Sequence, residues 1–273
     1  LCRHSPRDVV AAVHFSKKNG SAAHPRGAGS GLCGSAIGRG IIVDFSRYMN
    51  RLRSFTPDPM TFSCEPGYKY GELEQLLAGA KAEGPTGLFF PPAPSSGEYA
   101  TFGGMYGTNA GGGYSVKYGN VADYLLDAEV VFADGSVRTL NDIAAIDPSQ
   151  LPPAFRELYN EVLDNSKLIK NSYPDVPCNV CGYELRYLTQ NKRLNLHKLL
   201  GGSEGTLGIV TRLTFRLMPK PTHSTLIVAY FNDIVSSAKA AQLAIPRNPA
   251  GIEIMDKSLI KIAQEHEPSL KDK

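Results

Sequence analysis

Three glycine-rich stretches hold the residues of this chain that could do chemistry: Pro25–Gly34, Thr101–Gly113 and Gly201–Thr211. Glycine is placed where the backbone needs positive φ or must approach another group closely. A run of amides without side chains also forms a natural cradle for an anion. The first stretch adds one cation, Arg26, and one hydroxyl, Ser30. Together the stretches predict the wall of a site for a large, flat, phosphate-bearing ligand.

The first stretch fits neither of two common phosphate-binding motifs. Gly29 and Gly34 have the P-loop spacing, but Ser35 follows where that motif requires lysine. Gly27 and Gly29 could begin a Rossmann fingerprint, but Leu32 stands where the third glycine should fall. What remains is a tight turn of amides suited to a pyrophosphate. A plain glycine turn is the alternative.

The other two stretches offer different groups to a ligand. In the second, Asn109 stands between glycines, and its amide could donate and accept hydrogen bonds in the plane of a heterocycle. Its neighbours include Phe102 and Tyr106, whereas a flexible surface loop would carry small polar residues. In the third, Glu204 is the only charge and Ile209 begins an apolar run. A strand entry with a bulge is the alternative for this stretch.

Regular elements are predicted on both sides of the glycine stretches. Ser5-Pro6-Arg7-Asp8 has the N-cap, Pro and acidic residue of a helix start. Ala133-Asp134-Gly135 is a hairpin signal between two apolar runs. The patterns predict strands at 41–45, 61–66, 88–90, 128–132, 136–140 and 206–217, and a helix at 70–81. Beyond Pro219-Lys220-Pro221 they predict a strand at 226–231, a helix at 233–245, a strand at 251–255 and a helix at 258–264.

Composition excludes several classes of protein. The chain has 273 residues, 42% of them hydrophobic and 20% charged, as in an ordinary globular protein. Its net charge of +3 is spread without basic runs, so no nucleic-acid partner is expected. No apolar stretch is long enough for a membrane span. The first residues lack an initiating Met and a signal-peptide layout, so we expect an excised part of a longer chain.

The five cysteines are an odd number without repeated spacing, which favours a reducing compartment over a disulfide scaffold. Cys178 and Cys181 form a lone CxxC pair. A zinc or cluster site needs two further ligands, and no second CxxC or HxxxH pair is present. No metal site is therefore expected.

The motifs resemble the FAD-binding domain of the vanillyl-alcohol oxidase-type (PCMH-type) FAD-linked oxidases. The resemblance rests on successive motifs in one order, covering residues 1 to about 221: PRGAGSGL at 25–32, DFSRYMN at 44–50, EPG at 65–67, PSS at 94–96, TFGGMYGTNAGG at 101–112, KYG at 117–119, ADG at 133–135 and GSEGTLGIVT at 202–211. The branch that the chain looks most like contains the D-type polypeptide of glycolate oxidase and the D-lactate and D-2-hydroxyglutarate dehydrogenases.

This resemblance implies an α+β, two-subdomain PCMH-type FAD-binding fold followed by the beginning of an α+β cap domain. The implied boundaries are 1–84, 85–221 and 222–273. Carried over by position, the residues expected to bind FAD are Arg26, Gly27, Ala28, Gly29, Ser30, Gly31, Leu32, Pro94, Ser95, Thr101, Gly103, Gly104, Asn109, Ala110, Gly112, Glu204, Gly208, Ile209 and Val210.

Departures from the family pattern limit what the resemblance implies. Some members tether FAD through a histidine in the first loop; none is present here, so non-covalent FAD is expected. The branch draws its substrate pocket, with histidine metal ligands, from a cap of which residues 222–273 resemble only the start. Catalytic residues are therefore left unassigned.

The implied function is the FAD-binding portion of a dehydrogenase or oxidase acting on a 2-hydroxy acid. Its implied partners are that small molecule, bound with the missing cap, and an unidentified electron acceptor. A cytoplasmic location is expected, with peripheral attachment of the full-length protein to the inner membrane as the alternative. Two other functions stay open: a non-catalytic binding domain that keeps the fold, and a flavoenzyme like UDP-N-acetylenolpyruvoylglucosamine reductase.

Overall fold

The structure is a computed structural model that describes residues 5–79, 86–176, 179–267 and 269. Its strands are β1 (Ala23–Arg26), β2 (Ile41–Asp44), β3 (Leu52–Thr56), β4 (Thr61–Cys64), β5 (Leu88–Phe89), β6 (Leu125–Val131), β7 (Val137–Thr139), β8 (Ile209–Arg216) and β9 (Met218–Pro219). Its helices are α1 (Pro6–Lys18), α2 (Tyr70–Leu77), α3 (Phe102–Gly107), α4 (Ser115–Tyr118), α5 (Leu140–Ala145), α6 (Pro153–Asp164), α7 (Ser166–Ser172), α8 (His197–Leu200), α9 (Ile234–Ala244) and α10 (Lys257–His266). The short 3-10 helices bounded within the described residues are η1 (Val121–Asp123), η2 (Pro148–Gln150), η3 (Gln190–Lys192) and η4 (Ile245–Arg247).

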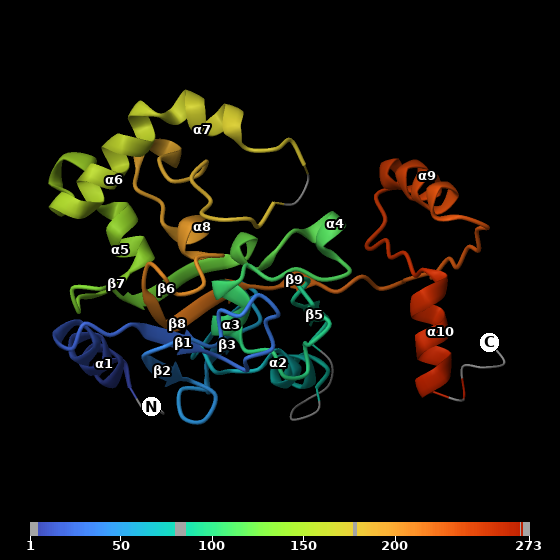
Figure 1. Ribbon diagram of the computed structural model, residues 1–273, viewed down its shortest axis with the longest axis horizontal. Coiled ribbons are helices and arrows are strands. Elements are labelled where there is room, and N and C mark those ends of the chain that lie inside the picture. The colour runs from blue at the N-terminus through green and yellow to red at the C-terminus, as the bar shows by residue number, and fades with distance from the viewer. Residues whose placement is uncertain (1–4, 80–85, 177–178, 268, 270–273) are drawn as a thin grey trace.

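A five-stranded antiparallel sheet in the order β3-β4-β8-β6-β7 forms the centre of the molecule (Figure 1). Strand β8 alternates buried with more exposed side chains, which agrees with the long strand that the sequence pattern predicts. The predicted hairpin is confirmed as β6 and β7, with Gly135 at φ +83° in the turn. Because β4 pairs with β8, the sheet joins the two predicted subdomains; their boundary at residues 84 and 85 lies outside the described residues.

A separate pair of parallel strands, β1 and β2, leads into and out of the first glycine stretch. Helix α1 packs against this pair through a small core that includes Val9, Val13 and Val43. The helix begins as the sequence predicts, since Asp8 Oδ2 accepts hydrogen bonds from the amide and hydroxyl of Ser5, both at 3.2 Å. This small core also takes in Ile209 of β8, so it fixes β1 against the central sheet.

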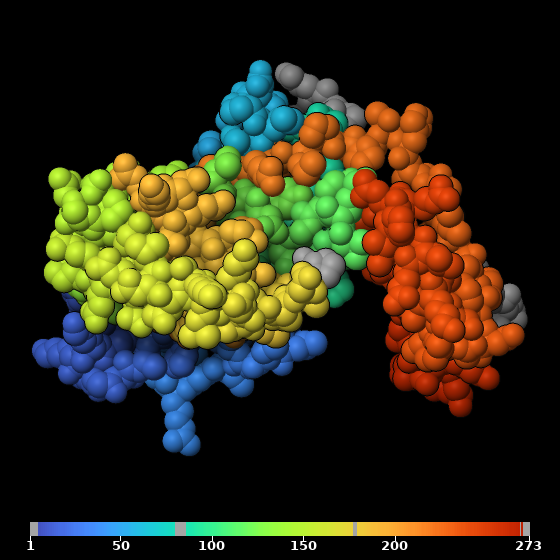
Figure 2. Space-filling view, turned by 90° about the horizontal axis from the view of Figure 1, so that it is seen from above, coloured from blue at the N-terminus to red at the C-terminus, as the bar shows by residue number. Residues whose placement is uncertain are grey.

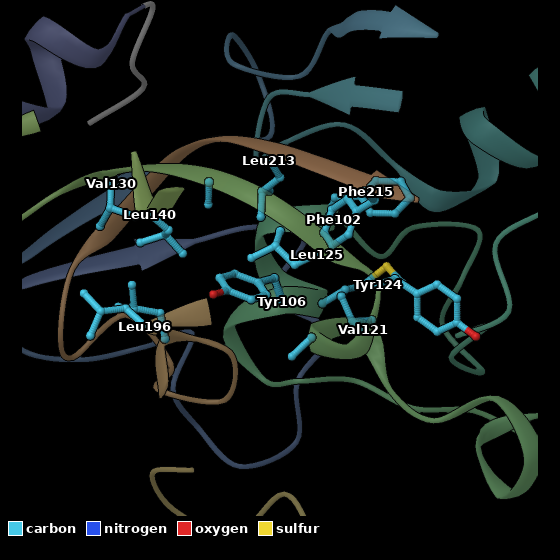
Figure 3. Packing of buried hydrophobic residues seen from close by; sticks show 14 of the residues in the cluster. Phe102, Tyr106, Val121, Tyr124, Leu125, Val130, Leu140, Leu196, Leu213 and Phe215 are labelled. Carbon is cyan, nitrogen blue, oxygen red and sulfur yellow. The ribbon is translucent and has the colours of Figure 1, made fainter. Parts of the chain in front are cut away.

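The main core packs the central sheet against α3, α5, α6 and α8, and Figure 3 shows part of it. Its aromatic part surrounds Phe102, the first residue of α3. The Phe102 ring centroid lies 5.0 Å from that of Phe62, 5.4 Å from Phe90 and 5.5 Å from Phe215. Tyr106, one turn later on α3, is also fully buried. These aromatic rings therefore support the short helix α3, although half of its residues are glycine.

The segment from residue 222 onward stands to one side of the sheet (Figures 1 and 2). Helices α9 and α10 confirm the two predicted helices. The two predicted strands, at 226–231 and 251–255, are wrong: both segments lack regular structure. A strand needs a partner for its backbone groups, and no described strand pairs with either segment. Accordingly, Leu226 and Ile227 are each 86% exposed.

Candidate functional site

The three glycine stretches, far apart in sequence, meet at one place. Gly27 of the first lies against Thr101 of the second, so that a Cβ on Gly27 would fall 2.0 Å from Thr101 Oγ1. Gly205 of the third lies against Pro25 of the first, where a Cβ would fall 2.2 Å from Pro25 Cγ. A side chain at either position would displace Thr101 or Pro25, so glycine allows the stretches to approach one another this closely.

Main-chain hydrogen bonds fix the third stretch to α3. The amide of Gly202 donates to the carbonyl of Tyr106 at 3.1 Å, and the amide of Glu204 donates to the carbonyl of Gly107 at 2.8 Å. Glu204 holds φ at +53°, a conformation that a non-glycine residue adopts only when its surroundings impose it. The hydroxyl of Tyr106 donates to the carbonyl of His197 at 2.6 Å, and burial raises the pKa of Tyr106 well above its usual range. The junction is therefore rigid on the side of α3 and α8.

The stretches enclose a cavity with about 1200 Å³ of atom-free space, its open mouth included. Most of the residues predicted to bind FAD line it: Arg26, Gly27, Ala28, Gly29, Ser30, Gly31, Pro94, Thr101, Gly103, Gly104, Ala110, Glu204, Gly208 and Val210. The structure thus brings together the groups that the sequence places in three separate loops. Their contact with FAD stays a prediction.

Five predicted residues do not line the cavity, and three of these support its walls instead. Asn109, at φ +46°, accepts a hydrogen bond from the amide of Ala122 at 2.9 Å, so its Oδ1 links α3 to η1. A Cβ on Gly112 would fall 1.8 Å from the carbonyl oxygen of Ala93, so this glycine lets two wall segments touch. Ile209 is buried in the small core under α1.

The remaining two lie at the edge of the site. Leu32 is fully exposed at the outer part of the first stretch. Ser95 does not reach the cavity, although the next residue, Ser96, does.

Several lining residues were not among those predicted. Phe45 and Pro66 belong to the motifs at 44–50 and 65–67, so their positions could have been carried over with the rest. Met105 and Tyr106 lie within the second stretch and contribute to the lining from α3. Leu200 gave no signal in the sequence, because it reaches the site only through the packing of α8. The others are Pro25, Ser35, Ala36, Ser96, Ala100, Gly107, Thr108, Ser203 and Gly205.

The donors of this cavity suit the pyrophosphate of a dinucleotide. Thr101 Oγ1 and Arg26 Nε are buried without a hydrogen-bond partner among the described residues. Between Ala28 and Cys33, no amide donates a hydrogen bond to another described residue. Unpaired buried polar groups cost free energy, so the presence of Thr101 Oγ1 and Arg26 Nε at one cavity, beside the exposed amides of residues 28–33, indicates a ligand that pairs with them. An anion with many oxygens can accept hydrogen bonds from all of these groups together: the amides, the hydroxyl and the guanidinium.

Thr101 allows a test in which stability and binding should change in opposite directions. Thr101→Val keeps the shape of the side chain but removes the unpaired hydroxyl. We expect the ligand-free chain to gain about 1 kcal/mol in free energy of unfolding, since a buried unsatisfied group is removed. FAD affinity should fall about tenfold, because the hydroxyl is then missing from the site. Urea unfolding and flavin fluorescence titration measure the two effects; a stability loss without an affinity loss would contradict this role.

Other kinds of site are not evident in the described ranges. These ranges contain no group of three or more His, Cys, Asp or Glu side chains placed to hold a metal ion. Of the CxxC pair, Cys181 is exposed and Cys178 lies outside the described residues. No helix found in the same ranges has the length and apolar character needed to cross a membrane.

Solved structures share this fold at low sequence identity. An alkyldihydroxyacetonephosphate synthase aligns with a TM-score of 0.53 and 23% identity over 82% of this chain and 32% of its own. The 6-hydroxy-D-nicotine oxidase from Arthrobacter nicotinovorans aligns with a TM-score of 0.51 and 20% identity over 80% of this chain and 36% of its own. The predicted α+β fold of PCMH-type FAD-binding oxidases is therefore confirmed.

Curated relatives cover nearly the whole chain. A D-2-hydroxyglutarate dehydrogenase of Pantoea ananatis is 28% identical over 95% of this chain and 26% of its own length. The glycolate oxidase subunit GlcD of Bacillus subtilis is 28% identical over 89% and 42%, and a D-lactate dehydrogenase of Archaeoglobus fulgidus is 30% identical over 94% and 47%. The chain thus spans between about a quarter and about half of the length of these relatives. Residues 1–141 match the family described as FAD binding domain, so the chain belongs to that family and its cofactor is FAD.

Proposed function

We propose that this chain is the FAD-binding part of a flavin-dependent dehydrogenase or oxidase that oxidises a 2-hydroxy acid. Bound FAD supplies a hydride acceptor for the carbon that carries the hydroxyl group. The proposal rests on one observation above all: the three glycine stretches close around unpaired donors in a chain whose relatives are named for three 2-hydroxy acids. D-lactate, glycolate and D-2-hydroxyglutarate are accordingly the candidate substrates.

In this proposal the residues of the cavity hold the cofactor in two ways. The amides of the first stretch, Arg26 and Thr101 neutralise and pair with the pyrophosphate. The glycines at the junction let the three stretches approach one another and form the walls around the cofactor, with Glu204 and Val210 on the wall formed by the third stretch. These groups act by preorganised hydrogen bonds that form without rearrangement of the wall.

Attachment of FAD is proposed to be non-covalent, because no histidine is present in the first glycine stretch. Denaturation with trichloroacetic acid should therefore leave the flavin in the supernatant. A yellow pellet would refute this part of the proposal.

The arrangement of domains is also part of the proposal. Residues 1–84 and 85–221 form the two FAD-binding subdomains, and residues 222–273 begin a cap that contributes to the substrate pocket. The exposure of apolar side chains in the last segment, such as Tyr230 at 86%, supports an incomplete unit. For the whole protein only, a cytoplasmic location is proposed, with peripheral attachment to the inner membrane as the alternative.

The decisive experiment uses the full-length gene product. After purification, its visible spectrum should contain the flavin bands, and D-lactate, glycolate or D-2-hydroxyglutarate should bleach them under anaerobic conditions. A dye acceptor should then restore the colour and support turnover. Flavin bands without bleaching by any of the three acids would refute the substrate class. A protein that neither carries nor takes up FAD would refute the entire proposal and favour a non-catalytic binding domain.

A further inference from the structure

The loop that carries the first glycine stretch must be held at both ends to keep its shape. It leaves β1 after Arg26 and enters β2 at Ile41, and these strands run parallel. A tight hairpin turn joins antiparallel strands only, so this connection has to cross back over the strand pair. Residues 27–40 contain no helix or strand to support that crossing. Their position therefore depends on the side chains under them.

Two side chains of β1 lie under the loop. Successive side chains of a strand point to opposite faces. Ala23, Ile41 and Val43 belong to the small core on the α1 side of the strand pair. His24 and Arg26 consequently share the other face, which is the face that the loop crosses.

Arg26 supports the outgoing end of the loop and His24 the returning end. A Cβ on Gly29 would fall 2.9 Å from an Arg26 guanidinium nitrogen. A Cβ on Gly38 would fall 2.5–2.8 Å from three atoms of the His24 ring. The ring nitrogen Nε2 of His24 lies 2.9 Å from the carbonyl oxygen of Arg39. Because a carbonyl oxygen only accepts, Nε2 carries the hydrogen and donates it.

We propose that His24 is a positioning residue for the cofactor. It does not line the cavity. It acts through the loop: its hydrogen bond to Arg39 and its ring under Gly38 fix the returning end, so that Gly31 and Ser35 stand in the cavity wall. The inference rests on this cavity being the FAD site, as proposed above, and is independent of the substrate. It assigns a function to a histidine outside the residues expected to touch FAD.

The first test compares three variants by FAD affinity, measured as quenching of flavin fluorescence. His24→Ala should raise the dissociation constant about tenfold, since one hydrogen bond and the support of Gly38 are lost. His24→Gln, whose side-chain amide can donate to Arg39, should stay within about threefold of wild type. His223→Ala is the control, because His223 is an exposed histidine in the segment after β9. Wild-type affinity in His24→Ala, or an equal loss in His24→Gln, would overturn the proposal.

A double-mutant cycle tests the contact itself. Gly38→Ala should displace the His24 ring and raise the dissociation constant about tenfold on its own. When His24→Ala is already present, the added Cβ has no ring to displace, and Gly38→Ala should change the constant by less than about twofold. Losses that multiply would show that the two residues act separately and would overturn the proposal. These measurements involve no turnover, so an error in the substrate class leaves them valid, whereas a wild-type chain unable to bind FAD would refute the cavity assignment as well.

Discussion

Replacement of Gly27 by alanine is expected to lower FAD affinity about 100-fold, because hydrogen bonds to a charged ligand are worth about 1.5–3 kcal/mol and several would be misplaced together. The added Cβ would fall 2.0 Å from Thr101 Oγ1, 3.4 Å from Thr101 Cβ and 3.5 Å from Gly104 Cα. Rotation of the Thr101 side chain would relieve the first contact, and the other two are ordinary van der Waals distances. The added methyl group therefore displaces the Thr101 hydroxyl or moves the first stretch away from α3, and either change misplaces donors that line the cavity.

Gly113 provides the control for this variant. It ends the second glycine stretch but does not line the cavity, and a Cβ there would approach only the end of the exposed Glu253 side chain, with Oε1 at 2.7 Å. Gly113→Ala should accordingly bind FAD within about threefold of wild type, since a flexible exposed side chain can move aside. Flavin fluorescence titration of the two variants, with urea unfolding of each ligand-free chain, separates lost affinity from lost stability. Gly27→Ala with the affinity of Gly113→Ala would contradict the steric account of the junction.

The sequence predicted the site better than it predicted the contacts within the site. The glycine-rich stretches and the order of the motifs predicted that Arg26, Thr101 and Glu204 belong to one site, and in the structure all three line one cavity. The same reasoning predicted that the Asn109 amide binds a heterocycle, whereas its oxygen accepts a hydrogen bond from the amide of Ala122. Which side of a loop faces a cavity depends on the backbone conformation at that residue, and a motif does not specify it.

The errors in the predicted secondary structure have a comparable physical cause. Strand β8 was predictable because its alternation reflects burial against a sheet that exists within this chain. The apolar run at 226–231 has the composition of a strand, but strand formation depends on a partner, and none lies beside it in the described ranges. Helices α9 and α10 were predicted correctly because a helix makes its hydrogen bonds within itself and each has an aspartate N-cap, Asp233 or Asp256. Sequence patterns therefore predicted an element correctly where the groups that stabilise it lie within or next to the element itself.

The largest loss of stability is expected for Phe102→Ala. Phe102 is fully buried, and its ring packs against those of Phe62, Phe90 and Phe215. Removing a buried aromatic ring costs about 3–5 kcal/mol in free energy of unfolding, out of a total of about 5–15 kcal/mol for a typical domain. Phe15→Ala is the control: Phe15 is 58% exposed on α1, so its loss should cost about 0.5 kcal/mol or less.

The Phe102 variant also tests how the core and the cavity are connected. Phe102 directly follows Thr101 and begins α3, so collapse of the core into the space left by the ring would draw the wall of the cavity with it. FAD at 100 times its dissociation constant should stabilise the wild-type chain by about 2.7 kcal/mol, since it binds only the folded state. If the wall moves, the same FAD concentration should stabilise Phe102→Ala by clearly less, whereas Phe15→Ala should keep the full effect. Urea unfolding with and without FAD measures both quantities, and an undiminished FAD effect in Phe102→Ala would show that the cavity wall is independent of the aromatic core.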